Sequence, residues 1–342
     1  MQALVLAGGE GTRLRPLTLT TPKPVMPLAG RPFLSFMIDW LRGHGVDDVV
    51  LACGFLAEAV EAVLGDAHGD VRLRYVVEDE PLGTAGPARL AADLGLLEDR
   101  LLVLNGDVLT DVDLTAQIAL HERMGAAATL ALVAVEDTAS YGVVPTFDDG
   151  RVEAFLEKST APVPTNRINA GAYVVERSVI DAIPAGRPVS FEREVFPRLA
   201  EAGTLYGHAS EGYWIDIGTP ERYLEATRDL LSGSVESTLP ERDAGGSLLY
   251  AGVDAAAAEI GPLSVLGPGC SVGAGSRIER AVLHSGVRVG AGCVVRESVL
   301  GDEVVVEDGA QVEGEAMVGR GARVPAGRQV GAGARVPPGA TA

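Results

Sequence analysis

Apolar positions in the first half of the chain form short runs, separated by stretches in which they recur at helical spacing. The runs predict buried strands at residues 4–6, 49–52, 71–77 and 101–104. The stretches between them predict helices that begin near residues 34, 57 and 87. This alternation indicates an α/β domain with a Rossmann-like, mixed or parallel sheet covered on both faces.

The next part of the chain is more mixed. Its apolar patterns predict strands at residues 129–135, 143–145, 151–155, 172–175, 205–209 and 214–216, and helices at 191–202 and 220–231. A polar segment with several glycines and a proline then predicts a linker. We therefore expect a first domain over residues 1–232, a linker over 233–247 and a second domain over 248–342.

The second domain has a repeating pattern, in which an aliphatic residue recurs every six positions with glycines nearby. The repeated residues are Ile260, Leu266, Val272 and Ile278, then Leu283, Val289 and Val295 after a slip of one residue, then Leu300, Val306, Val312, Val318, Val324, Val330 and Val336. Such a period is typical of hexapeptide repeats, so we expect a left-handed parallel β-helix. Because its ends and faces are exposed, we also expect a homo-oligomer assembled through this domain.

Charge and composition exclude several classes of function. A formal net charge of −19 argues against general nucleic-acid binding, so an anionic substrate must meet a local basic cluster. No apolar run approaches the length of a membrane span, and no signal peptide precedes the first strand. The three cysteines are scattered and form no CxxC pair. We therefore expect a cytoplasmic protein with no membrane or nucleic-acid partner.

A glycine-rich loop follows the first strand. Glycines at positions 8, 9 and 11 allow backbone N–H groups to approach a polyanion, and Arg13 follows on the same loop. Lys23 lies between two prolines that restrict its backbone. The glycine spacing differs from both the dinucleotide-binding and the Walker A motifs. The loop therefore predicts a phosphate site of another kind, and a glycine-rich turn with solvated arginines is the alternative.

The choice of basic residues supports the same site. Of the 28 basic residues, 26 are arginine and only two, Lys23 and Lys158, are lysine. A chain so strongly biased towards arginine retains lysine where a compact charge is needed, for example against a phosphate. Both lysines are therefore candidate phosphate ligands.

The segments Gly8-Gly-Glu-Gly-Thr-Arg-Leu-Arg-Pro16 and Pro22-Lys-Pro24 resemble the signature of the sugar-1-phosphate nucleotidyltransferases, most closely the mannose-1-phosphate guanylyltransferase branch. The resemblance implies a single in-line displacement in which a sugar 1-phosphate attacks an NTP and releases pyrophosphate. It favours GTP and mannose 1-phosphate, and glucose 1-phosphate with dTTP or UTP is the alternative. The implied catalytic residues are Arg13, Lys23, Asp107 and Lys158.

Two carboxylates are candidate metal ligands. Asp107 follows a buried strand, and Asp216 ends a short apolar strand that precedes a helix. One or two carboxylates together with phosphate oxygens suit Mg²⁺, and the resemblance implies that both residues bind this ion. From the residues alone, Asp107 could also be a turn aspartate and Asp216 a helix cap.

The remaining implied site residues contact the sugar phosphate and the nucleotide. The sugar-phosphate set is Gly142, Glu157, Lys158, Asn169 and Gly171. The nucleotide set is Leu6, Ala7, Gly8, Gly9, Gly11, Thr12, Arg13, Glu78, Gly83, Thr84, Asn105, Gly106 and Asp107. Relatives that bind uracil or thymine usually have glutamine in place of Glu78. A carboxylate only accepts hydrogen bonds, which suits guanine, although Glu78 could instead be a solvated member of an acidic run.

Two other classes of function remain open. A regulatory subunit could bind a nucleotide sugar without turnover, but every expected motif position is filled here. The repeat domain could be an acyltransferase, which usually needs a histidine base. It has one histidine, His284, which we interpret as a lone exposed residue, so assembly or allostery is the simpler role for this domain.

Overall fold

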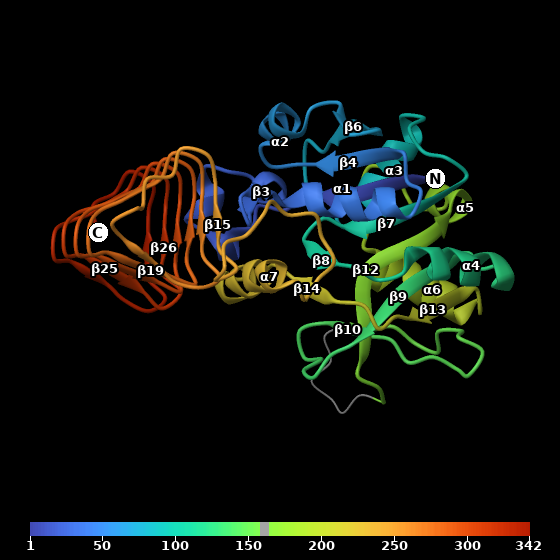
Figure 1. Cartoon of the computed structure of the whole chain (residues 1–342). Helices are drawn as coiled ribbons and strands as arrows, with labels where there is room; N and C mark the ends of the chain where they lie inside the picture. Colours follow the sequence, from blue (N-terminus) through green and yellow to red (C-terminus); the bar gives the residue numbers. More distant parts are fainter. Residues whose placement is uncertain (158–163) are drawn as a thin grey trace. The chain divides into compact units, whose positions relative to one another are not determined.

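The computed structural model describes residues 1–157 and 164–342, and these divide into two compact units (Figure 1). The first unit contains Met1–Gly9 and Met37–Trp214, and the second contains Glu10–Phe36 and Ile215–Ala342. The segment Glu10–Phe36, which includes Gly11 of the glycine-rich loop, is therefore part of the same unit as the C-terminal repeats. The division of the sequence into residues 1–232, 233–247 and 248–342 stays a prediction.

The first unit is built on one mixed sheet. Its strands are β1 (Gln2–Ala7), β4 (Asp48–Cys53), β5 (Ala67–His68), β6 (Val71–Val77), β7 (Arg100–Asn105), β9 (Ala128–Ala134), β10 (Gly142–Val143), β11 (Leu156–Glu157), β12 (Arg167–Glu176) and β13 (Leu205–Ala209). The order is β11-β10-β12-β7-β1-β4-β6-β5, and β9 pairs with both β12 and β13. Strands β7, β1, β4 and β6 are parallel, whereas β12 runs antiparallel to β7. The expected Rossmann-like mixed sheet is confirmed.

Helices and short segments complete this part of the chain, and the first and last of them include residues of the second unit. They are α1 (Phe33–Gly43), α2 (Ala57–Leu64), α3 (Gly86–Asp93), β8 (Val108–Thr110), α4 (Leu114–Met124), α5 (Arg177–Asp181), the π-helical turn η4 (Phe191–Val195), α6 (Phe196–Glu201) and β14 (Trp214–Asp216). Helix α3 packs on β4 and β6, and α4 packs on β9, β12 and β13. The rings of Tyr173, Phe191 and Phe196 form an aromatic cluster in the core beside these strands.

One predicted strand is wrong. Residues 151–155 form only isolated bridges, from Arg151 to Tyr206 and from Val152 to Thr146. A tight turn closes just before them, because Phe147 and Gly150 are joined by a backbone hydrogen bond of 3.0 Å. The chain therefore touches two neighbours briefly and makes no continuous ladder.

The second unit combines short turns with a parallel β-helix. Its first segments are the 3₁₀ turns η1 (Thr12–Leu14), η2 (Leu17–Leu19) and η3 (Lys23–Val25), the hairpin strands β2 (Pro27–Leu28) and β3 (Arg31–Pro32), and, later in the chain, α7 (Pro220–Ser232). The repeat strands are β15 (Leu248–Leu249), β16 (Glu259–Ile260), β17 (Val265–Leu266), β18 (Ser271–Val272), β19 (Arg277–Glu279), β20 (Val282–Leu283), β21 (Arg288–Val289), β22 (Val294–Arg296), β23 (Val299–Leu300), β24 (Val305–Val306), β25 (Gln311–Glu313), β26 (Met317–Val318), β27 (Arg323–Val324), β28 (Gln329–Val330) and β29 (Arg335–Val336).

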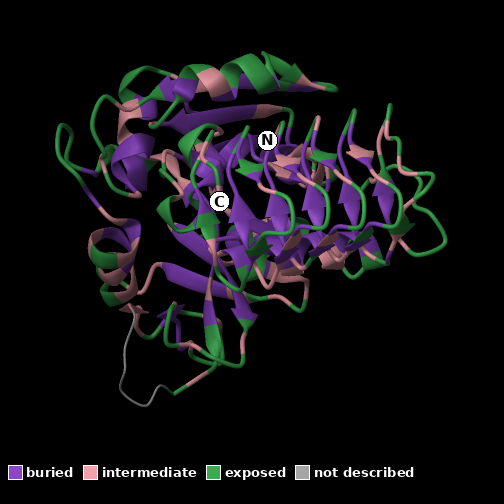
Figure 2. Ribbon diagram, turned by 90° about the vertical axis from the view of Figure 1, so that its left-hand side faces the viewer, coloured by how far each residue is buried: buried purple, intermediate pink, exposed green. Residues whose placement is uncertain are grey.

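From β16 onwards every third repeat strand stacks in the same sheet, and β15 pairs with β17, which gives three parallel sheets around one apolar core. The repeated aliphatic residues, such as Val289, Val306 and Val324, point into this core and are buried. Figure 2 shows the buried strands and the more exposed turns that join them. The expected β-helix is confirmed, and its aliphatic period is the spacing of the inward-facing side chains.

The slips in the six-residue period have a structural cause. The coil from Val265 to Val282 advances 17 residues, whereas the coil from Val299 to Met317 advances 18. The short corners each turn at one residue with positive φ, Arg280 (48°) or Glu297 (47°). The corner of the longer coil turns at Gly314 and Glu315, with φ of 66° and 62°. The slip therefore marks a corner that is one residue shorter. Within the described residues, no helix has the length and apolar character needed to span a membrane.

Candidate functional site

The site in the first unit lies where the parallel strands end. Register pairs Ala7 with Cys53 and Cys53 with Val77, and it pairs Leu6 with Asn105. The residues that follow these four strands therefore emerge at one edge of the sheet. They are Gly8 and Gly9 after β1, Gly54 after β4, Glu78 after β6, and Gly106 and Asp107 after β7. Ligands of open α/β sheets bind at such edges.

Glu78 lies directly over the glycine-rich loop. A side chain added at Gly8 would place its Cβ 2.8 Å from the Glu78 carboxylate, closer than atoms can approach. The Glu78 backbone donates to Cys53 O at 2.9 Å, and its Oε2 accepts from Leu82 N at 3.0 Å. Burial raises the pKa of Glu78, and the hydrogen bond from Leu82 partly opposes that rise. Glu78 is half-buried while its acidic neighbours are exposed, so it is not a solvated member of the acidic run.

The segment after Glu78 is bonded to Val189 and to the first two residues of η4. Gly83 has φ of +79° and packs on Val189, whose carbonyl accepts from Ala85 N at 2.8 Å. The Thr84 hydroxyl donates to Glu192 at 2.6 Å and accepts from Phe191 N at 2.9 Å. Both expected nucleotide-binding residues are therefore held by a segment about a hundred residues further along the chain.

A bulge in β12 shapes the next part of the edge. The register between β12 and β9 shifts between Asn169 and Tyr173, which re-aims the side chains there. Asn169 donates to the Tyr173 hydroxyl at 2.9 Å and accepts from Gly171 N at 3.1 Å. Gly171 has φ of +75°, and a Cβ there would lie 2.8 Å from the Asn105 amide. The structure therefore brings together Asn105, Asn169 and Gly171, which the sequence assigned to two different substrates.

The other expected sugar residues lie on a two-stranded part of the same sheet. Gly142 in β10 pairs with Glu157 in β11. A Cβ at Gly142 would lie 2.7 Å from the Phe155 ring and 3.0 Å from the Glu157 carboxylate. The expected phosphate ligand Lys158 lies outside the described residues.

The remaining expected residues belong to the second unit. Gly11 has a left-handed conformation (φ 61°) and begins η1, which carries Thr12 and Arg13. The Arg13 guanidinium packs on the backbone of Gly218, where a Cβ would come within 2.5 Å of it. Gly218 follows Asp216 by two residues. Arg13, the expected triphosphate ligand, therefore packs on the segment that carries Asp216, the expected metal ligand. Asp216 does not cap α7, because the Thr219 side chain fills that position.

Lys23 is buried, with only 8% of its surface exposed. Gly11 packs against it, since a Cβ at Gly11 would lie 3.3 Å from Lys23 Cβ. The Thr18 hydroxyl donates to the Gly11 carbonyl at 2.8 Å and fixes the loop on its other side. A buried ammonium needs polar or charged partners, so this placement suits a lysine with a dedicated role.

The two expected metal ligands lie in different units, Asp107 in the first and Asp216 in the second. Across the described residues, no group of three or more histidine, cysteine or acidic side chains gathers in one place. Each carboxylate supplies hard oxygen donors, which suit a magnesium ion that keeps most of its other ligands as water or phosphate oxygens.

Two features were missed or wrongly interpreted from the sequence. Glu192 carries no motif signal, yet it holds Thr84 and also the Ser190 hydroxyl, at 2.7 Å. His284 was expected to be exposed, and this was wrong, because it is buried with 6% of its surface accessible. Burial lowers the pKa of His284, and the nearby Asp302 opposes this lowering only in part.

Comparison with known proteins identifies the class. The family model described as Nucleotidyl transferase matches residues 2–233. A solved structure, HddC from Yersinia pseudotuberculosis complexed with GMP-PN, matches with a TM-score of 0.56 and 29% identity, covering 66% of this chain and 97% of that one. The chain belongs to the nucleotidyl transferase family.

The comparisons also indicate a particular branch. The model described as GMPPB C-terminal domain matches residues 251–338. A mannose-1-phosphate guanylyltransferase of Mycobacterium tuberculosis is 43% identical over 289 residues, covering 82% of this chain and 79% of the relative. A probable mannose-1-phosphate guanylyltransferase 2 of Arabidopsis thaliana is 38% identical over 341 residues, covering 94% of this chain and 91% of the relative.

Proposed function

We propose that this protein is a mannose-1-phosphate guanylyltransferase, which converts GTP and mannose 1-phosphate to GDP-mannose and pyrophosphate. The observation that carries the proposal is the Glu78 carboxylate, fixed over the glycine-rich loop at the carboxyl edge of the sheet. The names of the relatives support the same reaction.

Glu78 accounts for the choice of base. Its backbone and one carboxylate oxygen are engaged by the protein, so the carboxylate is held in place before a nucleotide arrives. An ionised carboxylate can accept hydrogen bonds from the amino and imino groups of guanine, which the other common bases do not present together. We expect the backbone at Gly8 and at Gly83-Thr84 to approach the nucleotide closely.

The reaction is a single displacement. An oxygen of the sugar phosphate attacks the α-phosphorus of GTP, the bond from that phosphorus to the β-phosphate oxygen breaks, and pyrophosphate leaves. No covalent enzyme intermediate is needed, so catalysis depends on positioning and on neutralising charge. Arg13 and Lys23 would neutralise the triphosphate. Lys158 would hold the attacking phosphate, and Glu157, Asn169, Gly142 and Gly171 would contact the sugar.

Enzymes of this class generally act with a divalent metal ion. We propose that it is Mg²⁺, held by Asp107 and Asp216, where it would neutralise charge on the phosphate oxygens. We also expect the enzyme to act in the cytoplasm as a homo-oligomer, assembled through the β-helix.

The test is pyrophosphate release by the full chain with Mg²⁺, with GTP, dTTP, UTP, ATP and CTP each paired with mannose 1-phosphate and with glucose 1-phosphate. Highest kcat/KM with GTP and mannose 1-phosphate, and GDP-mannose identified by mass spectrometry, supports the proposal. Preference for dTTP or UTP with glucose 1-phosphate contradicts it. A folded protein that binds GDP-mannose but turns over none of these pairs would be a regulatory subunit.

A further inference from the structure

The hairpin β2–β3 is held by a tyrosine from the first coil of the β-helix. Its two-residue turn consists of Ala29 and Gly30, with φ of 45° and 80°, between the paired residues Leu28 and Arg31. The ring of Tyr250 covers this turn so closely that a Cβ at Gly30 would collide with the ring carbons. The Tyr250 hydroxyl donates to the Ala29 carbonyl at 2.7 Å. The β-helix therefore fixes the turn by both packing and hydrogen bonding.

A second tyrosine fixes the start of the same hairpin. Tyr223 in α7 is completely buried, and its hydroxyl donates to the Pro27 carbonyl. The hydroxyl oxygen lies 3.2 Å from Nε2 of His284 in the β-helix. Because the hydroxyl proton is already directed to Pro27, His284 must be the donor in this pair. A chain of hydrogen bonds thus runs from the β-helix through α7 to the hairpin.

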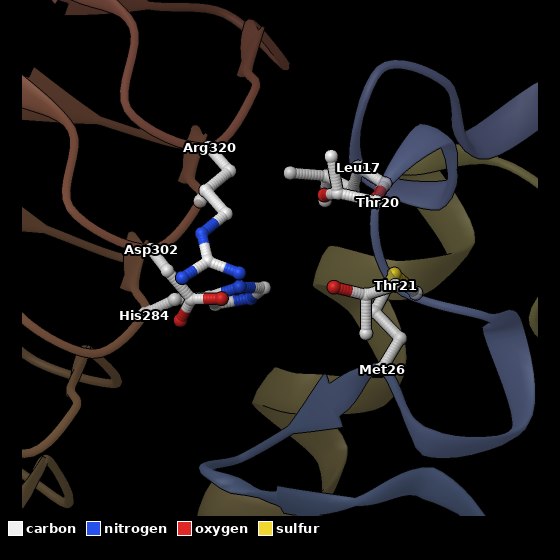
Figure 3. Close-up of a pocket in the computed structure, with 8 residues that line it drawn as sticks. Leu17, Thr20, Thr21, Met26, His284, Asp302 and Arg320 are labelled. Carbon is white, nitrogen blue, oxygen red and sulfur yellow. The ribbon is translucent and has the colours of Figure 1, made fainter. Parts of the chain in front are cut away.

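The space beside these contacts is small. Figure 3 shows side chains from the β-helix facing the segment that precedes the hairpin. The pocket between them is lined by Leu17, Thr20, Thr21, Met26, His284, Gly301, Asp302 and Arg320. Its cavity volume of about 10 Å³ has room for about one water molecule. This is a packed interface with no room for a small-molecule ligand.

The braced hairpin leads directly to Lys23. Met26 N donates to the Lys23 carbonyl at 3.2 Å, and Phe33 N donates to the Met26 carbonyl at 3.1 Å. On its other side Lys23 packs on Gly11 of the glycine-rich loop. Any displacement of the hairpin therefore reaches Lys23 within a few residues.

We propose that Tyr250 and Tyr223 are positioning residues for Lys23, which makes the β-helix and α7 working parts of the nucleotidyl-transfer site. The proposal rests on the proposed function, since it assigns Lys23 to the triphosphate. The benefit is preorganisation, because a buried ammonium held in one place loses no further freedom when the transition state forms.

The first test is Tyr250→Phe in the full chain. The matched control is Tyr75→Phe, which also removes a hydroxyl that donates to a backbone carbonyl, that of Gly65, in the first unit. We expect Tyr250→Phe to lower kcat roughly three- to tenfold, the range that one hydrogen bond provides. The KM for mannose 1-phosphate and the melting temperature should match those of the control. Tyr223→Phe should act in the same direction, and wild-type kcat in both variants would overturn the proposal.

The second test is a double-mutant cycle with Lys23→Ala. If Tyr250 acts through Lys23, Tyr250→Phe will have no effect on kcat when Lys23 is absent. The same fold-loss in both backgrounds would show a general structural effect and would refute a positioning role. Wild-type protein that makes no GDP-mannose refutes the proposed function and this inference together, whereas active wild type with additive variants refutes this inference alone.

Discussion

Replacing Gly83 by alanine tests the geometry of the expected base-binding segment. The native φ of +79° disfavours a side chain, at a cost of about 1–2 kcal/mol. The new Cβ would also lie 2.5 Å from Val189 O, 3.0 Å from Val189 C and 3.2 Å from Val189 N. All three are backbone atoms, so they cannot move aside as a flexible side chain would.

The matched control is Gly95→Ala. Gly95 has φ of +69°, and no other atom lies within 4 Å of the position that its new Cβ would take, so this replacement carries the conformational cost alone. At Gly83 the backbone must shift as well, which weakens the hydrogen bonds from Ala85 N to Val189 O and from Val189 N to Leu82 O. Weakening one or two such bonds costs about 1–3 kcal/mol more. We therefore expect Gly83→Ala to lower the free energy of unfolding by about 2–5 kcal/mol, against about 1–2 kcal/mol for Gly95→Ala.

The assay is urea unfolding followed by tryptophan fluorescence. The chain has two tryptophans, Trp40 and Trp214, and both lie in the first unit, so the signal reports on that unit. We also expect kcat/KM for GTP to fall in Gly83→Ala and to stay unchanged in Gly95→Ala, because only the former moves Thr84. Equal losses of stability in the two variants would refute the clash, and unchanged GTP kinetics in Gly83→Ala would refute the role of this segment.

Three further predictions concern the carboxylates and the buried histidine. Glu78→Gln should lower the kcat/KM preference for GTP over ATP by roughly ten- to a hundredfold. Because burial raises the pKa of Glu78, wild-type kcat/KM for GTP should fall as the pH drops through that raised pKa, whereas the variant should show no such step. A variant with the wild-type preference for GTP, or with the wild-type pH profile, would contradict the role of Glu78 in base recognition. Asp107→Asn and Asp216→Asn should each lower kcat at least about a hundredfold and raise the Mg²⁺ concentration needed for half-maximal rate, and an unchanged Mg²⁺ titration would exclude that residue as a ligand. Burial lowers the pKa of His284 below 6.5, so the unfolded chain binds a proton at a higher pH than the folded chain does. The stabilisation present above pH 6.5 is therefore lost as the pH falls towards the folded pKa. Circular dichroism melts between pH 7.5 and 5.5 should show a larger fall in melting temperature for wild type than for His284→Gln, and equal falls would contradict this.

The sequence by itself determined the elements whose signals are local. The buried strands β1, β4, β6 and β7 were recognisable as apolar runs, and the β-helix as a six-residue period, because each inward-facing position repeats within a few residues. The glycines and acidic residues that follow those strands were recognisable for the same reason. Parallel strands deliver their carboxyl ends to one edge, so a strand pattern already predicts which residues meet there.

Helix α4 shows where local signals fail. Its buried face contains Leu114, Gln117 and His121, so two of the three buried residues are polar. Gln117 donates to the carbonyls of Thr129 and Ala172, and His121 bonds to the Thr129 hydroxyl. A polar residue is tolerated in the core when its partners are present, and those partners belong to other strands. The hydrophobic period therefore missed this helix.

Only the tertiary structure decided the pairs that are distant along the chain. Thr84 meets Glu192, and Tyr250 meets Ala29, across 108 and 221 residues. His284 was expected to be exposed because the sequence pattern of its own repeat does not indicate that Tyr223 of α7 packs against it. The slips in the repeat period were visible in the sequence, but their cause is the backbone conformation at Arg280 and Glu297. A residue's type and local spacing fix its preferred conformation, whereas its burial and its partners depend on segments that folding brings to it.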